Sequence, residues 1–150
     1  MKANTASFTV RDADYAADLA MLRAIREAVF VQEQSVPLAL EWDAIDPDCR
    51  HALALDEFGA AIGTGRLTPQ RTIGRMAVID RWRGKGVGDA LLRHLIALAR
   101  DNAWPAISLH AQLDAVGFYR KFGFESYGPE YEEAGIRHQS MRLVLDQQAN

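Results

Sequence analysis

The chain has 150 residues, with 49% hydrophobic side chains, 25% charged side chains and a formal net charge of -3. This length and composition are typical of one globular domain, here residues 1–150, and exclude a disordered or fibrous chain. The negative charge argues against a broad nucleic-acid surface, because neutralising phosphates needs clustered Lys and Arg in surplus, so we expect no nucleic-acid partner.

The N-terminal part of the chain predicts one short strand and one amphipathic helix. Residues 7–10 form the strand candidate, and Asp12 or Asp14 can cap a helix that starts near Tyr15. Leucine, isoleucine and valine recur at helical spacing in this helix, with charges between them. From Phe30 the periodicity weakens into a Pro-containing acidic stretch, so we expect a loop there.

A run of strands follows and leads into alternating elements. An antiparallel hairpin and a third strand are predicted over residues 51–55, 60–68 and 73–79. The later pattern predicts a helix over 88–100, a strand over 106–110, a helix over 114–122, and strands over 124–127 and 139–145. Together these elements indicate a mixed α/β sheet with helices on both faces. An exposed edge at the last strand would allow a homodimer.

Two glycines in the strand over 60–68 and a glycine-rich turn after the strand over 73–79 have structural consequences. Gly63 and Gly65 indicate a bulge or a close neighbour. The turn itself, RGKGVG at 83–88, is neither a Walker loop nor a dinucleotide fingerprint. Its glycines let the backbone approach an anion at a helix N-terminus, where the dipole favours negative charge. The turn therefore predicts a local anion site, the alternative being an ordinary loop with solvated cations.

The same turn matches the pattern Q/R-x-x-G-x-G/A that marks acetyl-CoA binding in the GNAT superfamily of N-acetyltransferases, and a strand precedes it as in that family. ISLHAQLDAVGFYRKFGFE, at 107–125, is similar to the second family motif. REAVFVQEQSVPLALEWDAIDPDCRHAL and EEAGIRHQSM resemble the small bacterial ElaA-like subgroup. The resemblance spans residues 26–142 and implies an acyl-CoA N-acyltransferase fold, with a mostly antiparallel sheet of about six or seven strands.

The resemblance implies a transferase that moves the acetyl group of its cosubstrate, acetyl-CoA, to a primary amine of a small molecule by direct attack in a ternary complex. In the family, the turn's amides hold the pyrophosphate, and the preceding strand splays from its neighbour so that pantetheine pairs with its backbone. The implied cofactor contacts are Met76, Ala77, Val78, Arg83, Gly84, Lys85, Gly86, Val87, Gly88, Gln112 and Phe118.

Tyr119 is the family-matched general acid, because it lies on the helix that follows the strand over 106–110. A departing thiolate, with a pKa of about 8.5 if it behaves like cysteine, leaves more easily when a group donates a proton to it. The alternative is that Tyr119 packs with Phe118 and Phe122 as a boundary residue.

No motif fixes the general base. The residues of a suitable type are Glu33, Glu41, His110 and His138. We favour Glu33, which follows the first helix in the loop that lines the acceptor side in GNAT folds, although acidic residues in such a loop can simply be solvated. His110 ends a strand whose period of two turns it toward the cleft. The expected acceptor contacts are Phe30, Gln34, Glu41 and His138.

The acidic residues after Phe30 have two interpretations. Glu41, Asp43, Asp46 and Asp48 either attract a cationic amine or provide helix caps and solvated turns. They show no ordered metal-ligand spacing, and we expect no metal.

Cysteine usage and hydropathy bear on the compartment of the protein and on a covalent mechanism. Cys49 is the only cysteine, which excludes an intrachain disulfide, and it is a poor acyl carrier. No signal peptide or membrane-spanning run is seen, so we expect a cytoplasmic protein without a membrane partner. Two other functions stay open, a protein or peptide N-acetyltransferase and a non-catalytic acyl-CoA-binding sensor.

Overall fold

The computed structural model describes residues 7–34 and 45–145. Within them an eight-stranded sheet has the order β1-β2-β3-β4-β5-β8-β6, and β7 also pairs with β8. The strands are β1 (Phe8–Ala13), β2 (Arg50–Asp56), β3 (Ala61–Leu67), β4 (Thr72–Val78), β5 (Ala106–Gln112), β6 (Glu125–Ser126), β7 (Tyr131–Glu133) and β8 (Ile136–Val144). β4 and β5 are parallel and the other pairs are antiparallel, which confirms the predicted mixed sheet.

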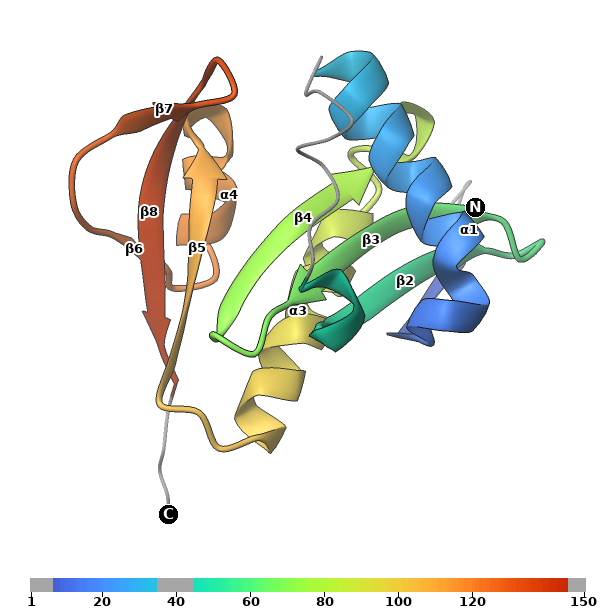
Figure 1. Ribbon diagram of the computed structural model, residues 1–150, viewed down its shortest axis with the longest axis horizontal. Coiled ribbons are helices and arrows are strands. Elements are labelled where there is room, and N and C mark those ends of the chain that lie inside the picture. The colour runs from blue at the N-terminus through green and yellow to red at the C-terminus, as the bar shows by residue number, and fades with distance from the viewer. Residues whose placement is uncertain (1–6, 35–44, 146–150) are drawn as a thin grey trace, which may run out of the picture.

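Helices cover both faces of the sheet, as predicted (Figure 1). They are α1 (Tyr15–Arg26), the π-helical η1 (Glu27–Glu33), α3 (Val87–Asp101), α4 (Val116–Arg120) and the single turns η2 (Asp46–Asp48), η3 (Asp80–Trp82) and η4 (Leu113–Ala115). α1 packs on β3 and β4, and the main core lies between the sheet and α3 with α4. Among the described residues no helix is both long and apolar enough to cross a membrane.

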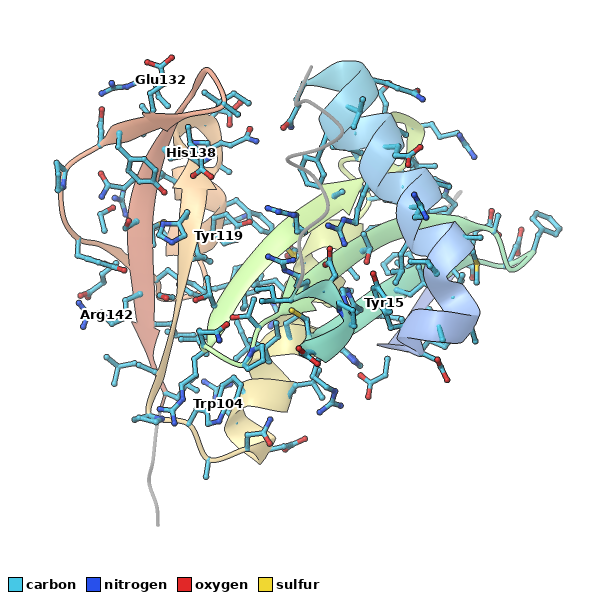
Figure 2. The ribbon with its side chains drawn as sticks, in the orientation of Figure 1. Tyr15, Trp104, Tyr119, Glu132, His138 and Arg142 are labelled. Atoms are coloured by element: carbon cyan, nitrogen blue, oxygen red, sulfur yellow. The ribbon has the colours of Figure 1, made fainter. Side chains whose placement is uncertain are left out.

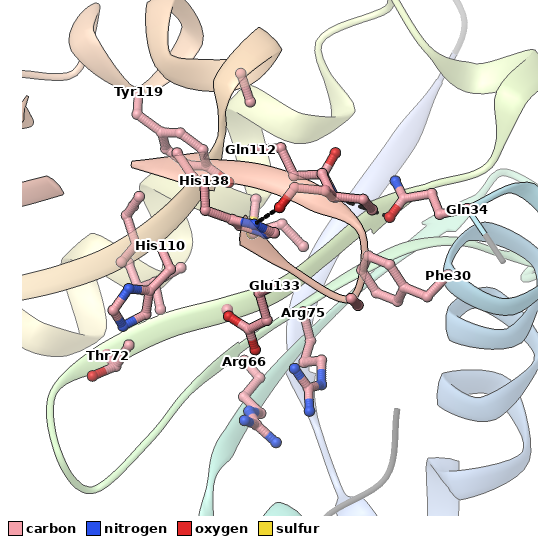
Figure 3. Close-up of a pocket in the computed structure, with 18 residues that line it drawn as sticks. Phe30, Gln34, Arg66, Thr72, Arg75, His110, Gln112, Tyr119, Glu133 and His138 are labelled. Atoms are coloured by element: carbon pink, nitrogen blue, oxygen red, sulfur yellow. Dashed lines mark hydrogen bonds between the residues drawn. The ribbon is translucent and has the colours of Figure 1, made fainter. Parts of the chain in front are cut away.

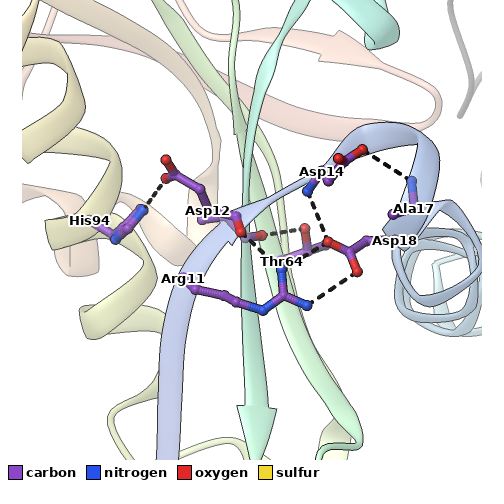
Figure 4. Close-up of polar contacts among 8 residues, drawn as sticks. Arg11, Asp12, Asp14, Ala17, Asp18, Thr64 and His94 are labelled. Carbon is purple, nitrogen blue, oxygen red and sulfur yellow. Dashed lines mark hydrogen bonds and ion pairs between the residues drawn. The ribbon is translucent and has the colours of Figure 1, made fainter.

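The first helix starts where predicted but ends later. Asp14 is its N-cap and accepts a hydrogen bond from the Ala17 amide at 3.1 Å, whereas Asp12 contacts His94 instead (Figure 4). Asp12 also accepts a hydrogen bond from Arg50. The loop expected from Phe30 begins later than predicted, because the chain continues as η1 to Glu33, and residues 35–44 of the expected loop lie outside the described residues. A π-helix has a wider turn than an α-helix, so the 3.6-residue pattern fades although the helix goes on.

The glycines of β3 allow close packing, as predicted. A Cβ on Gly65 would lie 2.6 Å from Met76 Sδ, and one on Gly63 would lie 3.0 Å from Leu91 Cδ1. Beside Gly65 the β3–β4 register shifts by one residue, and Arg75 on β4 adopts a φ of +51°. This extra residue is a β-bulge, which bends β4 and increases its twist.

The last strand is not an edge of the sheet. β8 pairs with β5 along one side and with β6 and β7 along the other. In the described part of the chain the sheet instead ends at β1 and β6. The predicted homodimer contact at an exposed edge of the last strand is therefore wrong, because this strand has partners on both sides.

Asp46 is the centre of a buried ionic cluster, and not a solvated acid as one interpretation held. Its carboxylate is 1% exposed and lies 3.0 Å from Arg26 Nη1 and 2.8 Å from Arg66 Nη1. His51 Nε2 donates to the Asp46 carbonyl at 2.8 Å, and burial lowers the pKa of His51. The cluster therefore connects α1, η2, β2 and β3.

Replacing Asp46→Asn should lower the free energy of unfolding by about 3–5 kcal/mol, because it removes a buried carboxylate that two guanidinium groups contact. Urea denaturation measures the change. Asp48→Asn, two residues away and exposed, is the control and should change the stability by less than about 0.5 kcal/mol. Equal stability of the two variants would contradict the role given to the cluster.

Candidate functional site

A gap in the sheet separates β4 from β5. These strands pair only at Thr72 with Ser108 and at Ile73 with Leu109. Beyond this point β4 stays on β3 and β5 continues along β8, so the two strands diverge (Figure 1). The gap agrees with the splayed strand that the sequence resemblance implied.

The register of β4 decides which backbone groups face this gap. The Ile79 amide donates to the Ile62 carbonyl at 3.0 Å, so the backbone of Ile79 is directed toward β3. Hydrogen-bonding direction alternates along an antiparallel pair, which turns the backbone of Ala77 toward β3 and the groups of Met76 and Val78 toward the gap. The backbone groups of Ala77 are therefore used within the sheet, which disfavours the backbone contact predicted for Ala77; the contacts predicted for Met76 and Val78 stay predictions.

The glycine-rich turn leads into α3 through left-handed backbone. Gly84 and Gly86 have φ values of +76° and +87°, which glycine adopts at little cost. Gly86 is the N-cap of α3 and provides no capping side chain. The amides of the first helical turn and the positive end of the helix dipole are therefore directed at this loop.

A pocket of about 300 Å³ lies at this turn. Of the predicted cofactor residues it is lined by Val78, Arg83, Gly84, Gly86, Val87, Gly88 and Phe118. Lys85 is exposed and is not among the described lining residues. Arg83 Nε donates to the Val78 carbonyl at 2.8 Å, which fixes the guanidinium beside the end of β4.

Lys121 lines the same pocket and was missed by the sequence analysis. Its Nζ lies 5.5 Å from the centre of the Phe118 ring. The signal available was the three-residue spacing from Phe118, which brings both side chains to one face of a helix. Lys121 adds a second cation to the pocket.

A larger pocket, of about 430 Å³, opens where β4 and β5 diverge (Figure 3). It brings together these predicted site residues: Phe30, Gln34, Met76, His110, Gln112, Tyr119 and His138. Glu33 ends η1, but its side chain is outside the described part of the structure, and Glu41 lies outside the described residues. The roles predicted for these two residues stay predictions.

Tyr119 packs as a boundary residue and also lines a pocket, so its role as general acid stays a prediction. Its side chain is 9% exposed and makes edge contacts with Phe118 and Phe124, yet it lines the larger pocket (Figure 2). Burial raises the pKa of Tyr119 to about 12. The phenol is therefore neutral at physiological pH, with a proton to donate.

Two histidines share one face of the β5–β8 pair. His110 is opposite Ser140 and Gln112 is opposite His138, so alternation places all four side chains on the same side of the sheet. His110 Nδ1 lies 3.3 Å from Ser140 Oγ, and His138 Nδ1 lies 2.7 Å from the Ile136 carbonyl. Both rings reach the larger pocket.

Gln112 connects the gap to the first helical segment. Its Nε2 donates to Gln34 Oε1 at 2.9 Å. The sequence assigned Gln112 to the cofactor and Gln34 to the acceptor, and the structure places them in contact. This bond joins the end of β5 to the residue that follows η1.

Three charged residues of the larger pocket were missed as site residues. Arg66 and Arg75 come from β3 and β4, and Glu133 comes from β7 (Figure 3). The bulge expected near Gly65 was the available signal for Arg75, and Glu133 lies in the segment EEAGIRHQSM. Within the described residues no three His, Cys, Asp or Glu side chains group as metal ligands, so the expectation of no metal stays a prediction.

Comparison with known proteins identifies the family. A model of the acetyltransferase (GNAT) domain matches residues 10–145. The uncharacterised N-acetyltransferase YjcF of Bacillus subtilis is 34% identical over 121 residues, which cover 78% of this chain and 86% of the relative.

Solved structures agree with this match. ElaA of Escherichia coli has a TM-score of 0.80 and 29% identity, covering 91% of this chain and 99% of its own. An acyl-CoA N-acyltransferase from Pseudomonas aeruginosa has a TM-score of 0.82 and 28% identity, covering 92% and 100%. With the splayed strands and the glycine-lined pocket in place, the chain belongs to the GNAT family and is an acetyl-CoA-dependent acetyltransferase.

Proposed function

We propose that this acetyltransferase transfers the acetyl group to a primary amine of a small molecule, by direct attack in a ternary complex. The observation that carries the proposal is that the β4–β5 gap lies between two pockets of different character. Val78 lines the glycine-rich pocket and Met76 lines the larger one. On α4, Phe118 lines the glycine-rich pocket and its neighbour Tyr119 lines the larger one.

The glycine-rich pocket suits the diphosphate of coenzyme A. Backbone amides between Gly84 and Gly88 and the N-terminus of α3 favour an anion, and Arg83 and Lys121 line the same pocket as cations. From there the pantetheine arm would follow the gap and pair with the backbone of Met76 and Val78. The thioester would then reach the larger pocket beside Tyr119.

The size of the larger pocket favours a small acceptor. Its volume of about 430 Å³ is at the lower end of the range of small-ligand sites, about 300–1,000 Å³. Part of it would hold the arm and the acetyl group, because the pocket begins at the gap. The space left suits a small amine better than a peptide.

Tyr119 is proposed to assist departure of the thiolate. Its pKa of about 12 exceeds that of an ordinary thiol in water, about 8.5, so complete proton transfer between them would be uphill by about 5 kcal/mol. A thiolate leaving beside the buried Tyr119 would lose part of its own solvation, which would raise the pKa of the thiol and narrow this difference. Tyr119 would therefore donate a hydrogen bond to sulfur and release its proton as the carbon–sulfur bond breaks.

Direct attack is supported by the place of the cysteine. Cys49 is buried, its Sγ contacts the Ile45 carbonyl at 3.2 Å, and it is not among the described residues that line either pocket. It is therefore poorly placed to carry an acetyl group. A single cysteine, which cannot form an intrachain disulfide, also supports the proposed location in the reducing cytoplasm.

The function is tested by mixing the purified protein and acetyl-CoA with spermidine, glucosamine, lysine or a peptide with a free N-terminus, and measuring release of coenzyme A. We expect release above the blank rate with a small amine and intersecting initial-rate lines, as a ternary complex requires. Binding of acetyl-CoA with release at the blank rate would instead identify a sensor. Parallel lines with acetylated Cys49 would identify a covalent route.

Gly86→Ala should weaken acetyl-CoA binding about tenfold or more, because a side chain at a φ of +87° strains the loop whose amides hold the diphosphate. Titration calorimetry measures the dissociation constant. Gly59→Ala is the matched control, since Gly59 has a φ of +83°, equally open space around its Cβ position and a place in the β2–β3 turn. The diphosphate assignment fails if both variants bind like the unmodified protein.

Tyr119→Phe should lower kcat by about 100-fold while changing the acetyl-CoA dissociation constant less than twofold, because only proton donation to the leaving group is removed. Steady-state kinetics and calorimetry separate the two effects. Tyr127→Phe, on the exposed surface, is the control. Since the pKa of Tyr119 is raised to about 12, its phenol keeps its proton below that pH, so no alkaline loss of rate under pH 10 should arise from it.

A further inference from the structure

We propose that His138 is the general base of the acetyl transfer and that its Nε2 is the atom that accepts the proton. The assignment rests on the proposed function and adds to it, since no motif fixes a base. His138 lies on β8, opposite Gln112 at the end of β5, and lines the larger pocket (Figure 3). It thus shares the pocket with Tyr119, the proposed acid.

The hydrogen bond at Nδ1 determines the tautomer of His138. Nδ1 lies 2.7 Å from the Ile136 carbonyl, and a carbonyl oxygen only accepts hydrogen bonds. Nδ1 must therefore carry hydrogen. A neutral imidazole has one N–H, so the lone pair of the ring is at Nε2.

A stacked aromatic ring fixes the plane of this imidazole. Tyr131 of β7 is the direct cross-strand partner of His138, with ring centroids 5.6 Å apart and planes inclined by 21°. The stack and the Nδ1 bond together restrain both side-chain torsions. Within the described part of the chain no residue forms a hydrogen bond with Nε2, which leaves this nitrogen available to an acceptor amine or a bridging water.

The other proton acceptors of the pocket are less defined. His110 Nδ1 faces the Ser140 hydroxyl at 3.3 Å, and a hydroxyl either donates or accepts, so this contact does not select a tautomer. Glu133 is exposed, and a solvated carboxylate is a weaker base than an imidazole at neutral pH. His138 alone of these three has a preset basic atom.

Charged and titratable groups from several elements surround His138. Those that line the pocket with it are Arg66 of β3, Arg75 of β4, His110 of β5, Tyr119 of α4 and Glu133 of β7. Arg66 is also paired with the Asp46 carboxylate at 2.8 Å, so its charge is already balanced within the buried cluster.

In the proposed reaction the acceptor nitrogen loses two protons, and each of them has a named acceptor. The acceptor ammonium gives one proton to Nε2, directly or through one water, and its freed lone pair forms the carbon–nitrogen bond with the thioester carbonyl carbon. The carbon–sulfur bond breaks, and sulfur takes the proton of Tyr119. The second proton lost by nitrogen restores Tyr119 through water, and the imidazolium releases its proton to solvent.

The test compares His138→Gln with His110→Gln and with His94→Gln, an α3 residue that bonds Asp12 and is not among the described residues lining either pocket. The probe is the small amine that the unmodified protein acetylates fastest. We expect His138→Gln to lower kcat about 100-fold, leave the acetyl-CoA dissociation constant within twofold, and abolish the acidic limb of the pH–rate profile that His94→Gln keeps. Loss of that limb in His110→Gln instead would overturn the assignment.

A second measurement needs no acceptor and so separates this inference from the proposed function. Nitrogen-15 NMR of the labelled, unmodified protein at alkaline pH should show His138 protonated at Nδ1 and unprotonated at Nε2. The opposite tautomer would overturn the assignment. If no amine stimulates release of coenzyme A, the proposed function fails and the catalytic role of His138 fails with it, whatever the NMR result.

Discussion

The separation of β4 from β5 after two residue pairs is the constraint on which the rest of the site depends. If the parallel ladder continued, the backbone groups of Met76 and Val78 would be used within the sheet. Two features accompany the different courses of the strands. The bulge at Arg75 bends β4, and β5 follows β8 through seven consecutive pairs. The gap is therefore a product of strand pairing, and the side chains around it could vary without closing it.

The two sides of this gap use different chemistry. At the glycine-rich turn, the proposed recognition of the diphosphate depends on main-chain amides, a helix dipole and the left-handed backbone of Gly84 and Gly86. In the larger pocket, the proposed acceptor site is lined by side chains from η1, three strands of the sheet's centre, α4 and the β7–β8 hairpin. In this proposal the cosubstrate is matched by backbone geometry, whereas the acceptor is selected by side chains.

Periodicity and turn chemistry in the sequence were enough to predict the strands along the chain other than β7, a helix cap at Asp12 or Asp14, and a bulge or close neighbour at Gly65. The resemblance added the splayed strand. The misses have physical causes: a π-helical turn breaks the 3.6-residue pattern after Phe30, and an ionic cluster around Asp46 forms between residues far apart in the chain. The pocket side chains meet through cross-strand register, which one sequence does not specify, so the contact between Gln112 and Gln34 was not foreseen.

The bond between His138 and the Ile136 carbonyl spans only two residues of one strand. Because this bond lies within β8, it orients the His138 imidazole without a contact from the other elements that line the larger pocket. Substitutions at Phe30 or Arg75 would therefore reshape the proposed acceptor site during evolution or protein engineering without redirecting the imidazole. Such a division lets a lineage explore new amines while its proton-transfer apparatus stays constant.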